Sequence, residues 1–289
     1  MLWIAATITA AAAQTGRNLA QAGLTLRLGT LGATQVRFLY GLPFALLFLA
    51  LAALATGQAP PLPGPRALGW LALGGVAQIA ATALMLATMA RRGFAVSTAW
   101  LKTEPVLIAL AGLALGEHPS VPQAAGIVIA TIGVILSGRA GGQRGIGPVL
   151  TGLAAAAGFG ISAIAFRAGI LALGAPGPFL GAMTGLAIAL TIQVGLLALW
   201  LSHFRPGAMA ATRGEWRGSV AAGFLGAFGS AMWFFAFALT SAAAVRTLGL
   251  VEVIFAALLA RALYGQRPPG RALLGMAVIV AGVGLLLAG

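Results

Sequence analysis

The chain has 289 residues, of which 60% are hydrophobic and only 7% are charged. A water-soluble domain carries about 25% charged residues, so this chain cannot cover a globular surface with well-solvated groups. It has no cysteine, which excludes disulfides and thiolate metal sites, and its net charge of +13 comes from residues that lie mostly between apolar stretches. The composition therefore predicts an integral membrane protein with no cofactor and no nucleic-acid partner.

Apolar stretches recur along the whole chain, and most of them reach the about 20 residues that a helix needs to cross a membrane. They do not alternate between apolar and polar residues as membrane strands do, so an all-α fold is predicted. Clusters of Gly and Pro separate these stretches from one another. The ten predicted spans are residues 2–24, 34–56, 67–89, 94–115, 121–138, 147–170, 178–201, 217–239, 243–263 and 271–288.

The basic residues indicate how these spans are oriented. An even number of spans places both termini on the same side of the membrane. The even-numbered connections contain only Arg66 among basic residues, together with Glu117 and His118. Because arginine concentrates in cytoplasmic connections, we predict external (periplasmic) termini in a bacterial-type inner membrane. The arginines that flank the odd-numbered connections are Arg27, Arg37, Arg91, Arg92, Arg139, Arg144, Arg205, Arg213, Arg217, Arg261, Arg267 and Arg271.

The two halves of the chain, residues 1–144 and 145–289, resemble each other after a shift of 149 residues. Each half would contain five spans, and this odd number makes equivalent halves point in opposite directions across the membrane. The sequence therefore predicts two inverted five-helix repeats, an arrangement that places a solute site near the membrane midplane. The shift superposes Gly74 on Gly223, Thr98 on Thr247, Gly126 on Gly275 and Gly133 on Gly282.

These features resemble the drug/metabolite transporter superfamily, and specifically EamA-type proteins. The resemblance is carried by the fourth span running into Leu115-Gly116-Glu117, by Gly126 and Gly133, and by the segment from Gly275 to Gly282. It covers essentially the whole chain and implies a ten-span transporter that exports amino acids, other metabolites or drugs. The family pattern also has an acid after the ninth span, where this chain has Gln266.

Besides Arg261 near the end of the ninth, the predicted fourth and ninth spans contain four charged residues, namely Lys102, Glu104, Arg246 and Glu252. An ionisable group at midplane normally faces a cavity or a partner. Lys102 and Glu104 point to different sides of a helix, and so do Arg246 and Glu252. A network between the two helices is therefore predicted, either as a substrate site or as a lock between the spans. Pro105 marks either a hinge or an ordinary kink.

Polar and aromatic residues extend the candidate substrate site. Gln14, Arg17 and Asn18 share one face of the first span, although Arg17 is near enough to its cytoplasmic end to snorkel. Gln78 shares a face of the third span with Thr82. The complete predicted set is Gln14, Arg17, Asn18, Gln78, Trp100, Lys102, Glu104, Trp233, Arg246 and Glu252.

The sequence favours a secondary transporter that exports small polar metabolites such as amino acids by alternating access. Lys102 and Arg246 would hold a carboxylate, and Glu104 or Glu252 an amino group. A multidrug exporter driven by proton antiport is an alternative, as is a membrane-embedded enzyme or a passive channel. We predict no enzymatic activity, because the chain has no aspartate and its two histidines lie in different connections. The expected partners are a small-molecule substrate, membrane lipid, protons in the antiport alternative, and at most a weak homodimer partner.

Overall fold

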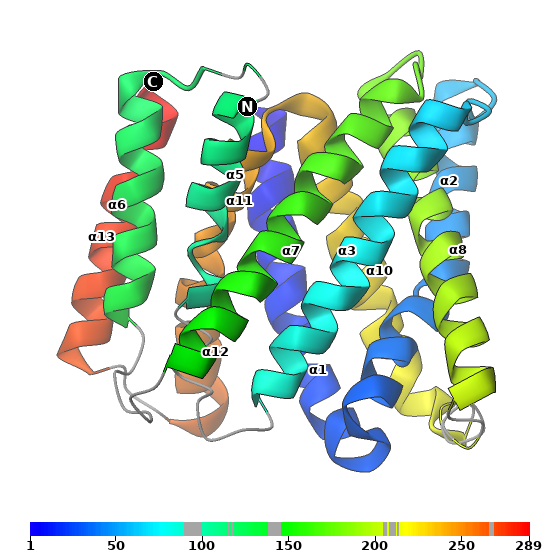
Figure 1. Cartoon of the computed structure of the whole chain (residues 1–289), viewed down its shortest axis with the longest axis horizontal. Coiled ribbons are helices and arrows are strands. Elements are labelled where there is room, and N and C mark those ends of the chain that lie inside the picture. The colour runs from blue at the N-terminus through cyan, green and yellow to red at the C-terminus, as the bar shows by residue number, and fades with distance from the viewer. Residues whose placement is uncertain are drawn as a thin grey trace. The chain divides into compact units, whose positions relative to one another are not determined.

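A computed structural model describes residues 1–89, 100–114, 116, 118–137, 146–204, 207, 212, 214–265 and 269–289. Its regular structure is helical, and the described residues contain no strand (Figure 1). The helices are α1 (Leu2–Leu39), α2 (Leu42–Thr56), α3 (Pro65–Met89), α5 (Glu104–Ala114), α6 (Val121–Ser137), α7 (Ile146–Ala172), α8 (Pro178–Phe204), α10 (Trp216–Leu239), α11 (Ala242–Leu248), η1 (Gly249–Val251), α12 (Glu252–Tyr264) and α13 (Gly270–Ala288).

Seven segments among the described residues are long and apolar enough to cross a membrane. Two further apolar helices, α5 and α6, are shorter. The protein is therefore a multi-pass, all-helical membrane protein. Several residues on which the topology prediction depends lie outside the described residues, namely Arg91, Arg92, Thr98, Glu117, Arg139, Arg144, Arg205, Arg213, Gln266 and Arg267, as does the beginning of the predicted span 94–115.

Helix α1 is longer than predicted. The predicted first span ends at residue 24 and the predicted second span begins at residue 34, whereas α1 continues without a break to Leu39. The intervening stretch has no proline, and a glycine such as Gly29 or Gly32 costs a helix only about 1 kcal/mol relative to alanine. The turn comes instead at Tyr40 and Gly41, immediately before α2 and its proline in the first turn.

The turn at Tyr40 and Gly41 divides the predicted second span, and two further predicted spans are interrupted helices. The fourth was expected to continue through Glu104, but the chain turns at Lys102 and Thr103 and α5 begins at Glu104. Pro105 is compatible with this helix start. Backbone N–H groups in the first turn of a helix have no acceptor within the helix, so the N–H that proline lacks is not missed there. The ninth is divided by η1, so that Glu252 begins α12. Each acid is therefore the first residue of a helix.

The helices form two compact units, each built from segments of both halves of the sequence. Unit 1 contains Met1–Ile79 and Ser162–Thr240. In unit 1, α1 packs along α10, and α8 packs against α2 and α10. Its core includes aromatic residues such as Phe166 and Phe234, whose ring centroids are 4.7 Å apart. Unit 1 thus supplies a helical core for the polar residues of α1 and α10 described below.

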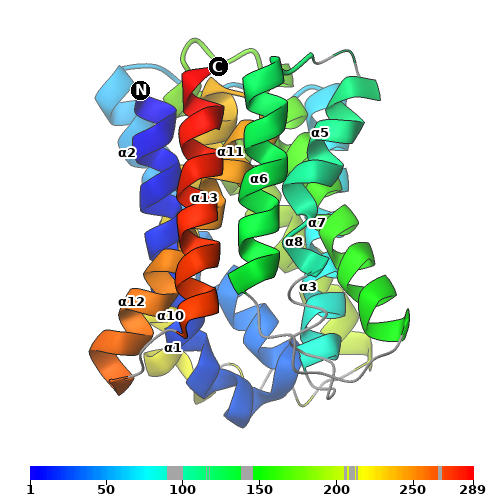
Figure 2. The same cartoon turned by 90° about the vertical axis from the view of Figure 1, so that its left-hand side faces the viewer.

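Unit 2 contains Ala80–Ile161 and Ser241–Gly289, and its largest helix contact is between α6 and α13. These helices lie side by side in both views (Figures 1 and 2). A Cβ atom added to Gly126 would lie 2.6 Å from the carbonyl oxygen of Gly282, and one added to Gly133 would lie 2.7 Å from that of Gly275. The two helices are therefore antiparallel and approach so closely that only glycine fits at these crossings.

Candidate functional site

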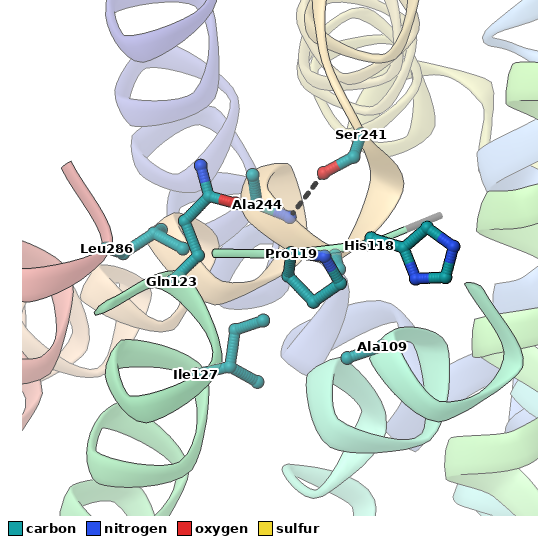
Figure 3. A pocket seen from close by; sticks show the side chains of 9 residues that line it. Ala109, His118, Pro119, Gln123, Ile127, Ser241, Ala244 and Leu286 are labelled. Carbon is teal, nitrogen blue, oxygen red and sulfur yellow. Dashed lines mark hydrogen bonds between the residues drawn. The ribbon is translucent and has the colours of Figure 1, made fainter. Parts of the chain in front are cut away.

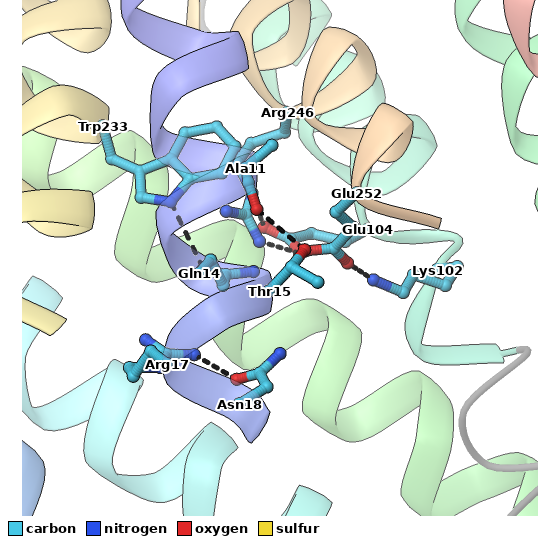
Figure 4. Close-up of polar contacts among 10 residues, drawn as sticks. All are labelled: Ala11, Gln14, Thr15, Arg17, Asn18, Lys102, Glu104, Trp233, Arg246 and Glu252. Atoms are coloured by element: carbon cyan, nitrogen blue, oxygen red, sulfur yellow. Dashed lines mark hydrogen bonds and ion pairs between the residues drawn. The ribbon is translucent and has the colours of Figure 1, made fainter. Parts of the chain in front are cut away.

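The four charged residues predicted to form a network all belong to unit 2, and they form two ion pairs (Figure 4). The Arg246 guanidinium donates from Nε to Oε1 of Glu104 at 2.7 Å and from Nη2 to Oε2 at 2.6 Å. The Lys102 ammonium pairs with Oε1 of Glu252. Each pair joins the region of α5 to the α11–α12 segment, which confirms the prediction that Glu104 finds its partner on another span. Two parallel hydrogen bonds also give the Glu104–Arg246 pair a fixed geometry.

These pairs are largely enclosed by protein. The side chain of Glu104 is 8% exposed, and those of Lys102, Arg246 and Glu252 are 22%, 21% and 15% exposed. Two acids and two bases balance in charge, so the group as a whole avoids the cost of an uncompensated buried ion. Glu104 also lies in the first turn of α5, where the backbone dipole favours negative charge. The interrupted helices thus create a neutral but highly polar cluster inside unit 2.

A second polar group lies on α1 and α10 in unit 1. The indole nitrogen of Trp233 donates to Oε1 of Gln14 at 3.2 Å, and Arg17 donates to Oδ1 of Asn18 at 2.7 Å (Figure 4). Arg17 could snorkel to the cytoplasmic end of the predicted span, but in the structure it is buried, with 8% exposure. The longer α1 explains this difference, since it carries Arg17 far from a helix end and against Gly226 of α10.

Gln78 on α3 is joined to a residue that sequence reasoning missed. Gln193 on α8 is 1% exposed and donates from Nε2 to Oε1 of Gln78 at 2.7 Å. The same nitrogen lies 3.4 Å from the carbonyl oxygen of Gly75. In the sequence, Gln193 could have been recognised as the single glutamine within the long apolar stretch of the seventh predicted span. Trp100, by contrast, is 37% exposed, and Asn18 is exposed.

Replacing Gln193 with methionine tests this buried amide pair. We expect the free energy of unfolding to fall by about 1–3 kcal/mol, because the substitution keeps the approximate volume but removes a donor from buried oxygens. Thermal unfolding of the purified protein, followed by tryptophan fluorescence, measures the effect. Thr191→Ala on the same helix is the control, since the Thr191 hydroxyl bonds only within its own helix, to Ala187. An equal loss in both variants would contradict a specific role for the pair.

Known proteins resemble the chain along its whole length. The model of the EamA-like transporter family matches residues 1–139 and again residues 146–288. One solved crystal structure, described only as that of a protein, superposes with a TM-score of 0.68 at 20% sequence identity. The match covers 98% of this chain and 95% of that one, which shows a shared fold. No curated protein matches the chain significantly.

Proposed function

The chain belongs to the EamA-like transporter family within the drug/metabolite transporter superfamily, and on this premise we propose that it exports small polar metabolites such as amino acids by alternating access. Family membership makes the protein a membrane transporter. Family membership does not specify the substrate class, the direction of transport or the mechanism, and these three are what we propose. The observation that carries it is the balanced ion-pair cluster at the start of two interrupted helices.

Interrupted helices and intramembrane charges are features that transporters use to bind polar solutes within the bilayer. Arg246 and Lys102 are the groups suited to a substrate carboxylate, and Glu104 and Glu252 those suited to an amino group. A zwitterion offers both charges at once, so it can replace the internal partners without leaving a net buried charge. Trp100 near this cluster in sequence, and Gln14, Arg17, Asn18, Gln78 and Trp233 of unit 1, complete the proposed substrate-binding set.

The proposal includes ten spans arranged as two inverted repeats, residues 1–144 and 145–289. The glycine contacts of unit 2 support it. The shift of 149 residues superposes Gly126 on Gly275 and Gly133 on Gly282. In the structure Gly126 faces Gly282 and Gly133 faces Gly275, and a Cβ added to any of the four would meet the backbone of the facing helix. Reciprocal contacts of this kind are expected where equivalent elements meet across a two-fold axis.

We further propose that the protein resides in a bacterial-type inner membrane with both termini external. The arginine-rich odd-numbered connections support this orientation. The proposed partners are the solute and the surrounding lipid, and the proposed assembly state is a monomer or a weak homodimer. The two acids offer a route to proton coupling, because a carboxylate that binds a proton releases its basic partner.

Uptake into proteoliposomes tests the transport proposal. We expect saturable counterflow of labelled amino acids, and an imposed pH gradient separates proton-coupled exchange from uniport. Vesicles without protein provide the control, and monodispersity in detergent verifies that the protein is folded. Absence of flux for every metabolite tested with folded protein would contradict the proposal. Single-channel currents without saturation would identify a channel instead.

A further inference from the structure

A cavity of about 130 Å³ lies within unit 2, beside Ala109 in the middle of α5. It is bounded by α5, by His118 and Pro119, and by the beginnings of α6 and α11, with Leu286 of α13 at one side (Figure 3). Most lining side chains are small or apolar. The polar ones are His118, Gln123 and Ser241.

The hydrogen bonds already made by these residues leave donors for a ligand. Oε1 of Gln123 accepts from the backbone N–H of Ser120 at 3.1 Å, which leaves its amino group available to donate. Oγ of Ser241 accepts from the backbone N–H of Ala244 at 3.3 Å, so its hydroxyl hydrogen is also available (Figure 3). His118 is exposed and supplies a ring N–H. Among the residues that the structure describes, none that lines the cavity is acidic.

The geometry points to a second binding site, in which this cavity holds a small carboxylate through Gln123, Ser241 and His118. Three donors around a small, mainly apolar cavity match an acceptor-rich group with a short carbon chain. The site is separate from the charged cluster. Ala109 lies about 7.5 Å along α5 from Glu104, and Ser241 lies about 7.5 Å along the segment from Arg246. The binding of a carboxylate in this cavity does not depend on the proposed function. A further role of the cavity, as a vestibule through which the transported solute passes, rests on the proposed function.

Cysteine labelling can test the site cleanly, because the chain has no cysteine of its own. In Ala109→Cys the only thiol lines the cavity, and its reaction with N-ethylmaleimide reports whether the cavity is occupied. We expect sodium acetate to slow this reaction several-fold at constant ionic strength, and acetamide to slow it much less. Binding should be weak, with a Kd on the order of 1–100 mM, because a ligand of four non-hydrogen atoms gains at most about 1.5 kcal/mol per atom.

Two changes in the Ala109→Cys background identify the donors. Gln123→Glu keeps a side-chain oxygen that accepts from the Ser120 N–H, because Ser-x-x-Glu is also a helix-capping pair. The same change replaces the Gln123 amino group, which would donate to the carboxylate, with a negatively charged oxygen. Acetate protection should disappear in this variant and weaken in His118→Ala, which changes only an exposed side chain. Gln58→Cys in the exposed segment between α2 and α3 is the matched control and should show no protection.

Equal protection by acetate and acetamide, or none by acetate, would overturn the proposal. So would acetate protection that persists in both donor variants, or protection of Gln58→Cys to the same extent. These experiments use detergent-solubilised full-length protein and require no transport. A failure of the carboxylate site is therefore distinguishable from a failure of the transport proposal, which proteoliposome flux decides.

Discussion

Replacing Glu104 with glutamine is expected to reduce metabolite flux by about tenfold to a hundredfold, because a charge-assisted hydrogen-bonded interaction contributes about 1.5–3 kcal/mol. The variant keeps the shape of the side chain and one acceptor for Arg246, but it removes the negative charge that both Nε and Nη2 contact. The protein should remain folded at reduced stability. Initial rates in proteoliposomes, corrected for the amount of folded protein, measure the loss. Glu252→Gln should act in the same direction through Lys102.

An exchange of the paired residues separates a substrate site from a structural lock. If the ion pair only holds α5 and α11 together, Glu104→Arg combined with Arg246→Glu should restore both stability and flux. If the pair binds the solute, the exchange should recover much of the thermal stability but not the flux, because the charges that meet the solute have changed places. Recovery of normal flux in the double variant, or normal flux in both Glu→Gln variants, would contradict the site assignment.

Placing an alanine at Gly282 is expected to destabilise unit 2 strongly. The added Cβ would lie 2.8 Å from the Gly126 carbonyl oxygen and 2.8 Å from the Ala130 Cα, and neither atom can rotate away as a side chain would. The α6 and α13 backbones must therefore separate. Forced overpacking typically costs about 1–3 kcal/mol, and here the obstruction is backbone. A lowered unfolding temperature and a loss of folded material on size-exclusion chromatography are the expected measurements.

Gly284→Ala is the matched control on the same helix. A Cβ at Gly284 meets no atom within 4 Å, so the change should be neutral or slightly stabilising through helix propensity, by up to about 1 kcal/mol. Because Gly133 corresponds to Gly282 in the proposed repeat, Gly133→Ala should resemble Gly282→Ala. Equal stability of Gly282→Ala and Gly284→Ala would contradict the close approach of these helices.

The membrane class and the family could be read from the sequence, because long apolar stretches and clustered arginines are local features that the bilayer itself selects. The charged residues were likewise identifiable one by one, since an ionisable side chain within an apolar stretch stands out whatever its partner. Helical periodicity even indicated that Glu104 does not pair with Lys102. Periodicity along one helix carries no information, however, about which residue of another helix faces it.

The all-helical membrane architecture, the family and the rare polar residues in the spans could thus be predicted from the amino-acid sequence. The pairing of Glu104 with Arg246 and of Lys102 with Glu252, and the positions of both acids where the predicted spans are interrupted, became visible only in the three-dimensional structure. It also identified Gln193 as the partner of Gln78 and showed that α1 continues to Leu39. The physical reason is that apolar helices are encoded by local composition, whereas helix breaks, buried partners and glycine crossings depend on residues brought together from distant parts of the chain.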